Sequence, residues 1–296
     1  DEAARKSSPY KLEDNRHTFL IMKEERYFYV PDAQNNIELP EDEAKHAVSV
    51  LRLQAGDEVF LIDGEGTFHR AEITMASKKH CNYSILESIP QQREWHGRIH
   101  LAMAPTKMMD RIEWFAEKAT EIGFDELSFL DCRLSERRQL RIDRIETKVV
   151  GAVKQSRKAW MPKVNDICDF KDFILSHNPK TKAGFYAIAH CYDDIEKTHL
   201  FERLNSQAPL SPPTRGDAQS GNKGDAQPLP LVGASPLLVE GAGEVVLLIG
   251  PEGDFHHDEV LFALEHGYHS ISLGTSRLRT ETAALSAVMM ARLHFS

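Results

Sequence analysis

The sequence lacks long apolar runs and has only four cysteines among its 296 residues. No segment approaches the ~20 apolar residues that a membrane-spanning helix needs, and the first residues do not show the basic-then-apolar order of a secretory signal. The cysteines have neither the paired spacing of a zinc site nor that of a disulfide framework; they are Cys81, Cys132, Cys168 and Cys191. We therefore predict a cytoplasmic protein with reduced thiols, no membrane partner and no metal site.

An excess of positive charge is also missing, since the formal net charge is −9. Lysine and arginine supply much of the affinity of proteins for nucleic acid, so this balance argues at first against an RNA partner. Residues 132–163, however, carry ten Lys or Arg and only three acidic residues. A basic stretch on an acidic chain can bind an RNA backbone at one face. The alternative is a solvated helix whose charges pair within the helix.

The chain is long enough for two domains. Residues 1–22 are polar and without a clear period, and we expect them to be a leader or a vector-derived segment. Residues 23–96 alternate apolar and polar side chains in a way that predicts a small β-rich domain. Its expected strands are 27–30, 58–62, 67–74 and 82–88, with a short helix at 41–51. We expect His46, on that helix, to be packed.

Strand and helix patterns alternate from residue 97 to residue 296, which predicts an α/β domain with a parallel sheet covered on both faces. The expected strands are 99–104, 127–130, 182–189, 245–249 and 270–274, and the expected helices include 108–122 and 139–158. Residues 205–243 interrupt this order with many Pro, Gly, Ser and Ala residues. We interpret them as a flexible insertion, either disordered or acting as a lid.

Two glycine-containing loops follow the last two predicted strands. The first is Gly250-Pro251-Glu252-Gly253, and the second, Leu273-Gly274, leads through Leu278-Arg279-Thr280-Glu281-Thr282 into an apolar helix. Parallel sheets hold small ligands at the carboxyl ends of their strands, and glycine lets the backbone approach a ligand closely. The two loops therefore predict one pocket, although Gly250 and Gly253 also suit a purely structural turn.

These loops resemble the cofactor-binding signature of the RsmE-type 16S rRNA (uridine-N3)-methyltransferases of the SPOUT superfamily. The likeness extends through most of the chain after about residue 22. Further matches, in the same order as in the family, are His46 with Val50-Leu51-Arg52-Leu53 and Gly56-Asp57, Lys107 with Arg111, Glu117-Lys118-Ala119-Thr120-Glu121-Ile122-Gly123, Ser135-Glu136-Arg137, and Gln155-Ser156 with Pro162. The resemblance implies a PUA-like barrel followed by a SPOUT domain with a carboxyl-terminal trefoil knot, assembled as a homodimer.

The resemblance also implies a reaction, the transfer of a methyl group from S-adenosylmethionine to uridine N3 in the small ribosomal subunit. Residues carried over as cofactor-binding are Gly250, Glu252, Gly253, Leu273, Gly274 and Leu278. Arg279 is the candidate for stabilising charge on the base, with Glu281 or Glu252 as its polar partner or as the base, because N3 must lose a proton. A structural ion pair between Arg279 and Glu281 is the alternative. Candidate RNA contacts are Arg52, Arg137, Gln155 and Arg157.

Two positions depart from the family pattern. Asp254 stands where a further glycine is common, and His256 stands where a helix-capping serine is common, so we expect Asp254 or Asp258 to cap that helix instead. Thr280 or Thr282 is expected to cap the last helix.

Other functions stay open at this point. A SPOUT enzyme acting on another RNA base or on a ribose 2′-hydroxyl would show the same motifs, and so would a non-catalytic RNA-binding assembly factor. A dinucleotide enzyme is disfavoured, because the sequence has no strand-linked Gly-x-Gly-x-x-Gly with a downstream acidic residue.

Overall fold

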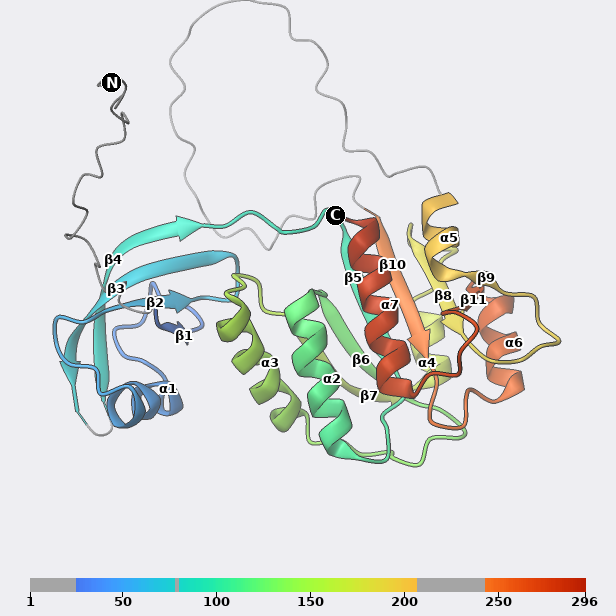
Figure 1. Cartoon of the computed structure of the whole chain (residues 1–296), viewed down its shortest axis with the longest axis horizontal. Coiled ribbons are helices and arrows are strands. Elements are labelled where there is room, and N and C mark those ends of the chain that lie inside the picture. Colours follow the sequence, from blue (N-terminus) through green and yellow to red (C-terminus); the bar gives the residue numbers. More distant parts are fainter. Residues whose placement is uncertain (1–24, 78–79, 207–242) are drawn as a thin grey trace, which may run out of the picture.

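The computed structural model describes residues 25–77, 80–206 and 243–296, which form two separate sheets and the helices that pack on them (Figure 1). The leader predicted at residues 1–22 lies outside the described residues. Most of the insertion predicted at residues 205–243 does too. Its first two residues, Asn205 and Ser206, end helix α5 (Leu200–Ser206), and Gly243 precedes strand β10 (Glu244–Ile249).

The amino-terminal sheet has four strands in the order β1-β2-β3-β4. They are β1 (Tyr27–Tyr29), β2 (Glu58–Ile62), β3 (Thr67–Ala76) and β4 (Cys81–Pro90). β1 runs parallel to β2, and the other neighbours are antiparallel. The alternation in the sequence places Phe28, Leu61 and Ile73 in a buried core. All four predicted strands are confirmed, with their ends shifted by up to two residues.

The helix predicted at 41–51 consists of two parts, the α-helix α1 (Glu41–Lys45) and a turn of π-helix, η1 (His46–Val50). Its buried face is formed by Ala44 and Ala47, which belong to the amino-terminal core. His46 lies between them in sequence and is exposed, with its ring 6.4 Å from the ring of Phe28. The expectation that His46 is packed is therefore wrong, because the helix turns it away from the face that the alanines bury.

The second sheet, as far as the described residues show, has seven strands in the order β7-β6-β5-β10-β8-β11-β9. All of its pairs are parallel. The strands are β5 (Arg98–Met103), β6 (Glu126–Asp131), β7 (Lys163–Asp169), β8 (Phe185–Ala189), β9 (Thr198–His199), β10 and β11 (His269–Ser272). The predicted parallel sheet is confirmed. The edge strands β7 and β9 were not predicted, because β7 is only half-buried and β9 has two residues.

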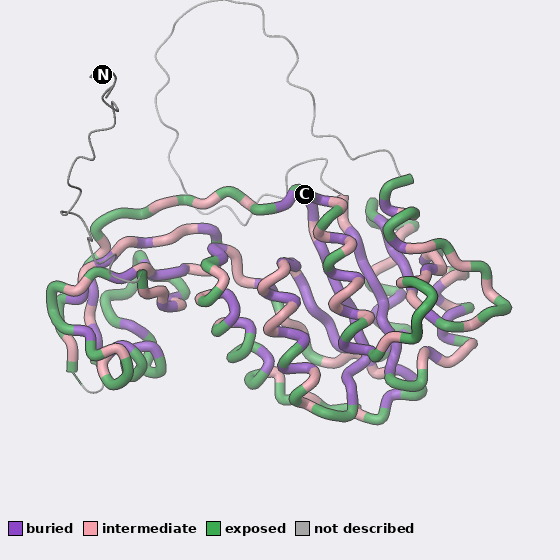
Figure 2. Tube along the Cα trace, in the orientation of Figure 1, coloured by how far each residue is buried: buried purple, intermediate pink, exposed green. Residues whose placement is uncertain are grey.

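Helices cover both faces of this sheet, as the predicted layers require (Figure 1). One layer is formed by α2 (Met109–Ile122), α3 (Ile142–Ser156), α5 and α7 (Thr280–His294), and the other by α4 (Phe170–Ser176) and α6 (His257–Glu265). The central strand β10 packs against both layers through alternate side chains. Val245 and Leu247 belong to the core under the first layer, and Val246 and Leu248 to the core under the second. The strands are accordingly the most continuously buried part of the chain (Figure 2).

The carboxyl-terminal segment crosses back over the sheet. β11 pairs with β8 and β9, yet the helix that follows, α7, packs against α2 and against strands β5 and β10. Residues 273–279 make this crossing, so they pass the carboxyl ends of the central strands. The trefoil knot itself, which concerns the threading of this segment, stays a prediction.

The two domains meet at the turn between β2 and β3. Gly66 donates its backbone N–H to the Ala159 carbonyl (3.0 Å), and Met161 donates to the Gly64 carbonyl (2.9 Å). A Cβ at Gly66 would lie 2.2 Å from Cζ2 of Trp160, so the turn packs directly on that indole. The amino-terminal domain is therefore fixed against the end of α3.

Within the described ranges, no helix is long and apolar enough to cross a membrane. The same residues contain no group of three or more His, Cys, Asp or Glu side chains arranged to hold a metal ion. The four cysteines are free thiols: Cys81 and Cys132 are buried, Cys168 is half-buried and Cys191 is exposed.

Candidate functional site

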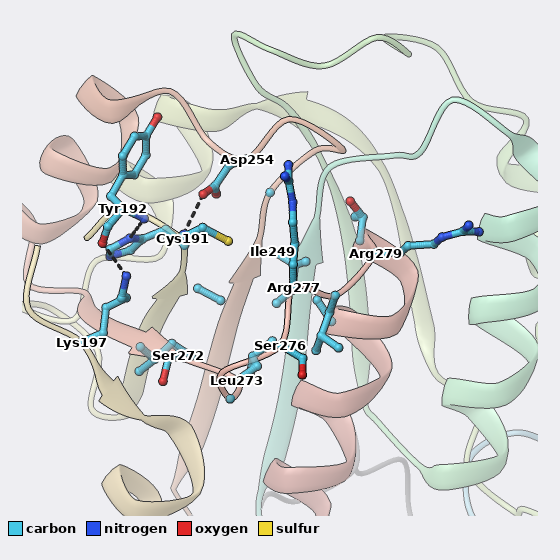
Figure 3. Close-up of a pocket in the computed structure, with 18 of the residues that line it drawn as sticks. Cys191, Tyr192, Lys197, Ile249, Asp254, Ser272, Leu273, Ser276, Arg277 and Arg279 are labelled. Carbon is cyan, nitrogen blue, oxygen red and sulfur yellow. Dashed lines mark hydrogen bonds between the residues drawn. The ribbon is translucent and has the colours of Figure 1, made fainter. Parts of the chain in front are cut away.

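A cleft of about 1280 Å³ lies at the carboxyl ends of β8, β10 and β11 (Figure 3). Its walls are the three loops that follow these strands, residues 190–197, 250–254 and 272–280, together with Arg111 from α2. Pockets for small ligands usually enclose about 300 to 1,000 Å³, so this one has room for a cofactor and part of a second molecule. The cleft brings together most of the predicted site residues: Gly250, Glu252, Gly253, Leu273, Gly274, Leu278 and Arg279.

Gly250 follows β10 in a turn that leaves no room for a larger side chain. A Cβ there would lie 2.9 Å from the backbone nitrogen of Phe255 and 3.0 Å from its Cδ2. Phe255 is fully buried and has no room to move away. Gly250 is therefore required by the fold, whatever the cleft binds.

Asp254, at the position where the resemblance predicts a glycine, has a φ of +75°. Aspartate is one of the few non-glycine residues that adopt this left-handed region. Its carboxylate stabilises the turn by accepting the backbone N–H of Phe255 (2.8 Å) and that of Cys191 across the cleft (2.7 Å). Asp254 thus takes a backbone conformation that glycine favours, and its carboxylate adds a link to the loop after β8.

His256 caps helix α6 itself. Its Nδ1 accepts the backbone N–H of Asp258 (3.2 Å), and the Glu259 carboxylate accepts the backbone N–H of His256 (2.8 Å), which completes a capping box. The expectation that Asp254 or Asp258 caps this helix is wrong, because the Nδ1 atom of His256 supplies the hydrogen-bond acceptor that a serine hydroxyl would supply. Helix α7 begins at Thr280, and no side chain caps it, so neither predicted threonine cap is present.

Residues 273–279 form a wall of the cleft that contains two leucines and two arginines. Leu273 and Leu278 are half-buried, whereas Gly274, Arg277 and Arg279 are exposed. In Figure 3, Arg279 points away from Cys191 and Lys197, and Arg277 takes a different direction. Neither arginine forms a hydrogen bond or an ion pair with any residue that the structure describes.

Arg111 connects the two predicted carboxylates. Its Nη1 lies 3.5 Å from Oε1 of Glu252 and 3.6 Å from Oε1 of Glu281. The Glu281 side chain is only 8% exposed, and its Oε2 is buried with no hydrogen-bond partner among the described residues. The predicted alternative, an Arg279–Glu281 ion pair, is therefore wrong. Sequence spacing gave no sign of the observed pairing, because the three residues lie on separate elements.

The loop after β8 is a wall of the cleft that the sequence reasoning missed. Three contacts fasten it to the 254–257 region: the Cys191–Asp254 hydrogen bond, a bond from the Tyr192 hydroxyl to the Phe255 carbonyl (2.8 Å), and one between His257 and Asp194 (3.0 Å). Lys197 donates to the Tyr192 carbonyl from within the loop. The signal for this wall was available, since the loop follows a predicted parallel strand and strand ends carry ligand sites.

His190 opens this loop as a neutral residue. Burial lowers its pKa below the ordinary value of 6.5, and its Nε2 shares a hydrogen bond with the Ser270 hydroxyl (2.8 Å). It is therefore uncharged at neutral pH, and Lys197 is the cation on this side of the cleft.

The four predicted RNA contacts do not form one group. Arg52 is exposed in the amino-terminal domain. Arg137 donates to the Lys107 carbonyl (2.5 Å) and so holds the loop after β5. Gln155 is exposed at the far end of α3, where Arg157 pairs with Glu25 (2.9 Å) and covers the ring of Tyr27. Arg137 and Arg157 thus have structural contacts of their own.

The basic stretch 132–163 is largely neutralised by its surroundings. Nine of its ten Lys and Arg residues form an ion pair with a carboxylate. Only Asp143 lies within the stretch, and the other acidic partners come from neighbouring elements, as Glu43 does for Lys154 (2.5 Å). Local net charge therefore does not describe this surface. The predicted alternative, ion pairs within one helix, is also not observed for most of these residues, because their acidic partners lie on other elements.

A family model described as an RNA methyltransferase domain matches residues 93–210 and 224–292. The chain belongs to this RNA methyltransferase family. A second model, the RNA methyltransferase PUA domain, matches residues 39–86. The predicted architecture of an α/β methyltransferase domain preceded by a PUA-like domain is thereby confirmed.

Relatives from several bacteria share nearly the full length of this RNA methyltransferase. The ribosomal RNA small subunit methyltransferase E of Rickettsia conorii is 25% identical over 264 residues, which are 88% of this chain and 91% of the relative. The Bacillus subtilis protein of the same name is 24% identical over 281 residues, covering 89% of this chain and 94% of the relative.

Solved structures extend the comparison. A probable rRNA-methyltransferase from Porphyromonas gingivalis is 34% identical with a TM-score of 0.72, covering 91% of this chain and 98% of the other. A ribosomal RNA small subunit methyltransferase E from Neisseria gonorrhoeae, bound to S-adenosyl methionine, has a TM-score of 0.67 at 22% identity, covering 91% and 97%. At that identity the second structure shows a shared fold.

Proposed function

We propose that the protein transfers a methyl group from S-adenosylmethionine to N3 of a uridine in 16S rRNA of the small ribosomal subunit. The observation that carries the proposal is the cleft of this RNA methyltransferase domain, in which both predicted glycine loops come together with Arg279, an arginine that has no ion-pair partner among the described residues. The names of the relatives support the small-subunit substrate. Because the proposed substrate is the small ribosomal subunit, we propose that the enzyme acts in the cytoplasm.

The cleft fits the cofactor in size and in lining. Ile249, Leu273 and Leu278 provide apolar surface for an adenine ring, and the backbone of residues 272–278 supplies donors and acceptors for its edge. Gly253 faces open space: apart from Gly253 itself and its two chain neighbours, no atom of the described residues lies within 4 Å of the place where a Cβ would stand. When bound, S-adenosylmethionine supplies an electrophilic methyl group on a sulfonium sulfur.

Methylation of uridine N3 requires two further functions from the protein: removal of the N3 proton and stabilisation of the negative charge that results. Uridine N3 carries a proton in the neutral base, and its removal leaves negative charge shared with the two neighbouring carbonyl oxygens. We assign the stabilisation of that charge to Arg279, which is exposed, lines the cleft and has no ion-pair partner among the described residues. Of the two candidate bases, Glu252 lines the cleft and Glu281 does not, so Glu252 is the better placed acceptor of the proton.

The substrate uridine must be unpaired, because N3 lies on the Watson–Crick edge that a base pair would block. We assign the first contacts with the surrounding RNA to the amino-terminal domain, including Arg52, and to the exposed end of α3 with Gln155. The fixed junction of the two domains would then present the base to the cleft.

We also propose a homodimer. Large apolar side chains are exposed on neighbouring helices of one layer: Trp114 on α2, Phe201 on α5, and Met289 and Leu293 on α7. Each of these side chains is between 42% and 56% exposed. α7 packs between α2 and α5 (Figure 1). Apolar groups gathered in this way are typical of a protein interface.

The proposal is tested by incubating the protein with labelled S-adenosylmethionine and small ribosomal subunits from a strain that lacks the modification. We expect N3-methyluridine in the digested 16S rRNA, identified by mass spectrometry. Methylation of another base or of a ribose hydroxyl would show a related enzyme instead. Binding of the subunits without methyl transfer would indicate an assembly factor.

Gly253 and Gly250 provide a matched pair of substitutions. Gly253→Val should keep the fold, because the site is open and the backbone has ordinary torsions, but should weaken binding of S-adenosylmethionine about tenfold or more by filling ligand space. Gly250→Ala should instead lower the free energy of unfolding by about 1–3 kcal/mol, because its Cβ collides with Phe255. Calorimetric titration and thermal denaturation measure the two effects. Unchanged affinity in Gly253→Val would remove Gly253 from the site.

A further inference from the structure

Arg277 is a cationic side chain of the cleft that makes no stabilising ion pair with the described residues. Its side chain is exposed and lines the cleft, on the loop between β11 and α7. It forms no ion pair or hydrogen bond with the residues that the structure describes. By contrast, nine of the ten basic residues in the stretch 132–163 are paired with carboxylates. Arg277 and Arg279 therefore differ from most cations of that stretch, because neither has an ion-pair partner among the described residues.

The carboxylates around the cleft are mostly engaged elsewhere. Glu252 lies beside Arg111, and Asp254 accepts two backbone N–H groups. Asp193 lies 3.9 Å from Lys197, and Glu196, on the far wall, forms no ion pair with Arg277. The cleft holds three other cations, Arg111, Lys197 and Arg279. Arg111 and Lys197 lie near carboxylates, whereas Arg277 has no counter-ion among the described residues.

The position of Arg277 favours an anion that arrives from outside. Residues 274–277 are all exposed, so an anion that arrives from solvent can reach the arginine. In Figure 3, Arg277 and Arg279 point in different directions, so the two guanidinium groups serve different places. Arginine binds phosphate oxygens through paired N–H donors, and a nucleotide that enters the cleft brings its own phosphates to the mouth.

We propose that Arg277 binds a backbone phosphate of the RNA next to the methylated nucleotide, and so holds that nucleotide at the cleft while Arg279 acts on its base. The inference rests on the proposed function for the identity of the RNA. It adds a separate contact, which recognises phosphate and carries no base specificity.

The test compares Arg277→Gln with Arg277→Lys and with Lys182→Gln. Lys182 is a matched control, because it is also an exposed cation with no ion pair among the described residues, but it precedes β8 and so lies at the opposite end of the sheet from the cleft. Binding to unmodified small ribosomal subunits is measured as a function of KCl concentration, and binding of S-adenosylmethionine by calorimetry. Thermal denaturation checks that each variant folds.

We expect Arg277→Gln to weaken subunit binding about tenfold at low salt and to reduce the slope of log affinity against log salt by about 0.7, the value for one phosphate contact on a single strand. Arg277→Lys should retain most of the slope, and Lys182→Gln all of it. Cofactor affinity should stay within about twofold in every variant.

Two results would overturn the inference. Subunit affinity and salt slope could be unchanged in Arg277→Gln, which would make the side chain a solvated surface residue. Alternatively, S-adenosylmethionine affinity could fall while the salt slope stays constant, which would assign Arg277 to the cofactor carboxylate. Both measurements are made without turnover. A failure of uridine methylation in the wild-type protein would therefore count against the proposed function and leave the phosphate contact to be judged separately.

Discussion

Arg279→Ala should retain the fold and the binding of S-adenosylmethionine but lose about 10²–10³-fold in the rate of methyl transfer, the loss that follows removal of a single group stabilising developing charge. Arg279 is exposed and makes no ion pair or hydrogen bond with a described residue. Its removal should therefore change the free energy of unfolding by no more than about 0.5 kcal/mol. Single-turnover methylation of unmodified small subunits, with cofactor present in excess, isolates the chemical step.

Thr282→Ala is the control for this variant. Thr282 is an exposed residue on the first turn of α7 that does not line the cleft, so its truncation should leave methyl transfer intact. Arg279→Lys should recover part of the lost rate, because charge is restored without the planar donor pair. A folded Arg279→Ala protein with a normal single-turnover rate would refute the role at the base.

Arg111→Gln is expected to have the largest effect on stability. The substitution leaves Glu252 and Glu281 without the cation that lies between them, and the Glu281 side chain is only 8% exposed. Breaking a fully buried pair costs about 3–5 kcal/mol. We expect about 2 kcal/mol here, because Arg111 is one-third exposed and solvent screens part of its charge. The midpoint of thermal unfolding should fall by roughly 4–8 °C.

Two comparisons identify the cause of that loss. Arg141→Gln removes an arginine from an exposed pair with Asp143 and should be almost neutral. The double variant Arg111→Gln/Glu281→Gln should be more stable than Arg111→Gln alone, because it no longer contains an uncompensated buried carboxylate. The losses in free energy of unfolding are also measured for Arg111→Gln and Glu281→Gln separately. If the loss in the double variant equalled the sum of these two losses, Arg111 and Glu281 would not interact.

The sequence was most informative where structure depends on local pattern. The apolar run Val245–Ile249 predicts a buried strand because both of its faces are covered, and the structure places that strand at the centre of the sheet. The glycine loops at residues 250 and 273 predicted a shared pocket for a similar reason, since parallel strands end at the same edge of a sheet. The edge strands gave weaker signals, because fewer of their side chains are buried.

What the sequence could not supply were the pairings between distant residues. Arg111 meets Glu252 and Glu281 only after three elements have packed together, and no spacing in the chain encodes that meeting. Proximity in sequence favours an Arg279–Glu281 pair instead, and the packed structure does not contain it. Asp254 shows the same limit, as its hydrogen bond to Cys191 joins loops on two different strands.

The ion pairs formed by the basic residues of the stretch 132–163 change how the affinity for RNA at this surface depends on salt concentration. A cation already paired with Asp131 or Asp258 carries a built-in counter-ion, and an approaching phosphate must displace a tethered carboxylate where it would otherwise release a free salt ion. Released ions make affinity depend on salt concentration, whereas an exchanged carboxylate does so much less. The salt exponent of RNA binding should therefore count the unpaired cations and not the total of basic residues. This protein could then hold RNA with a weaker dependence on ionic strength than its basic stretch suggests.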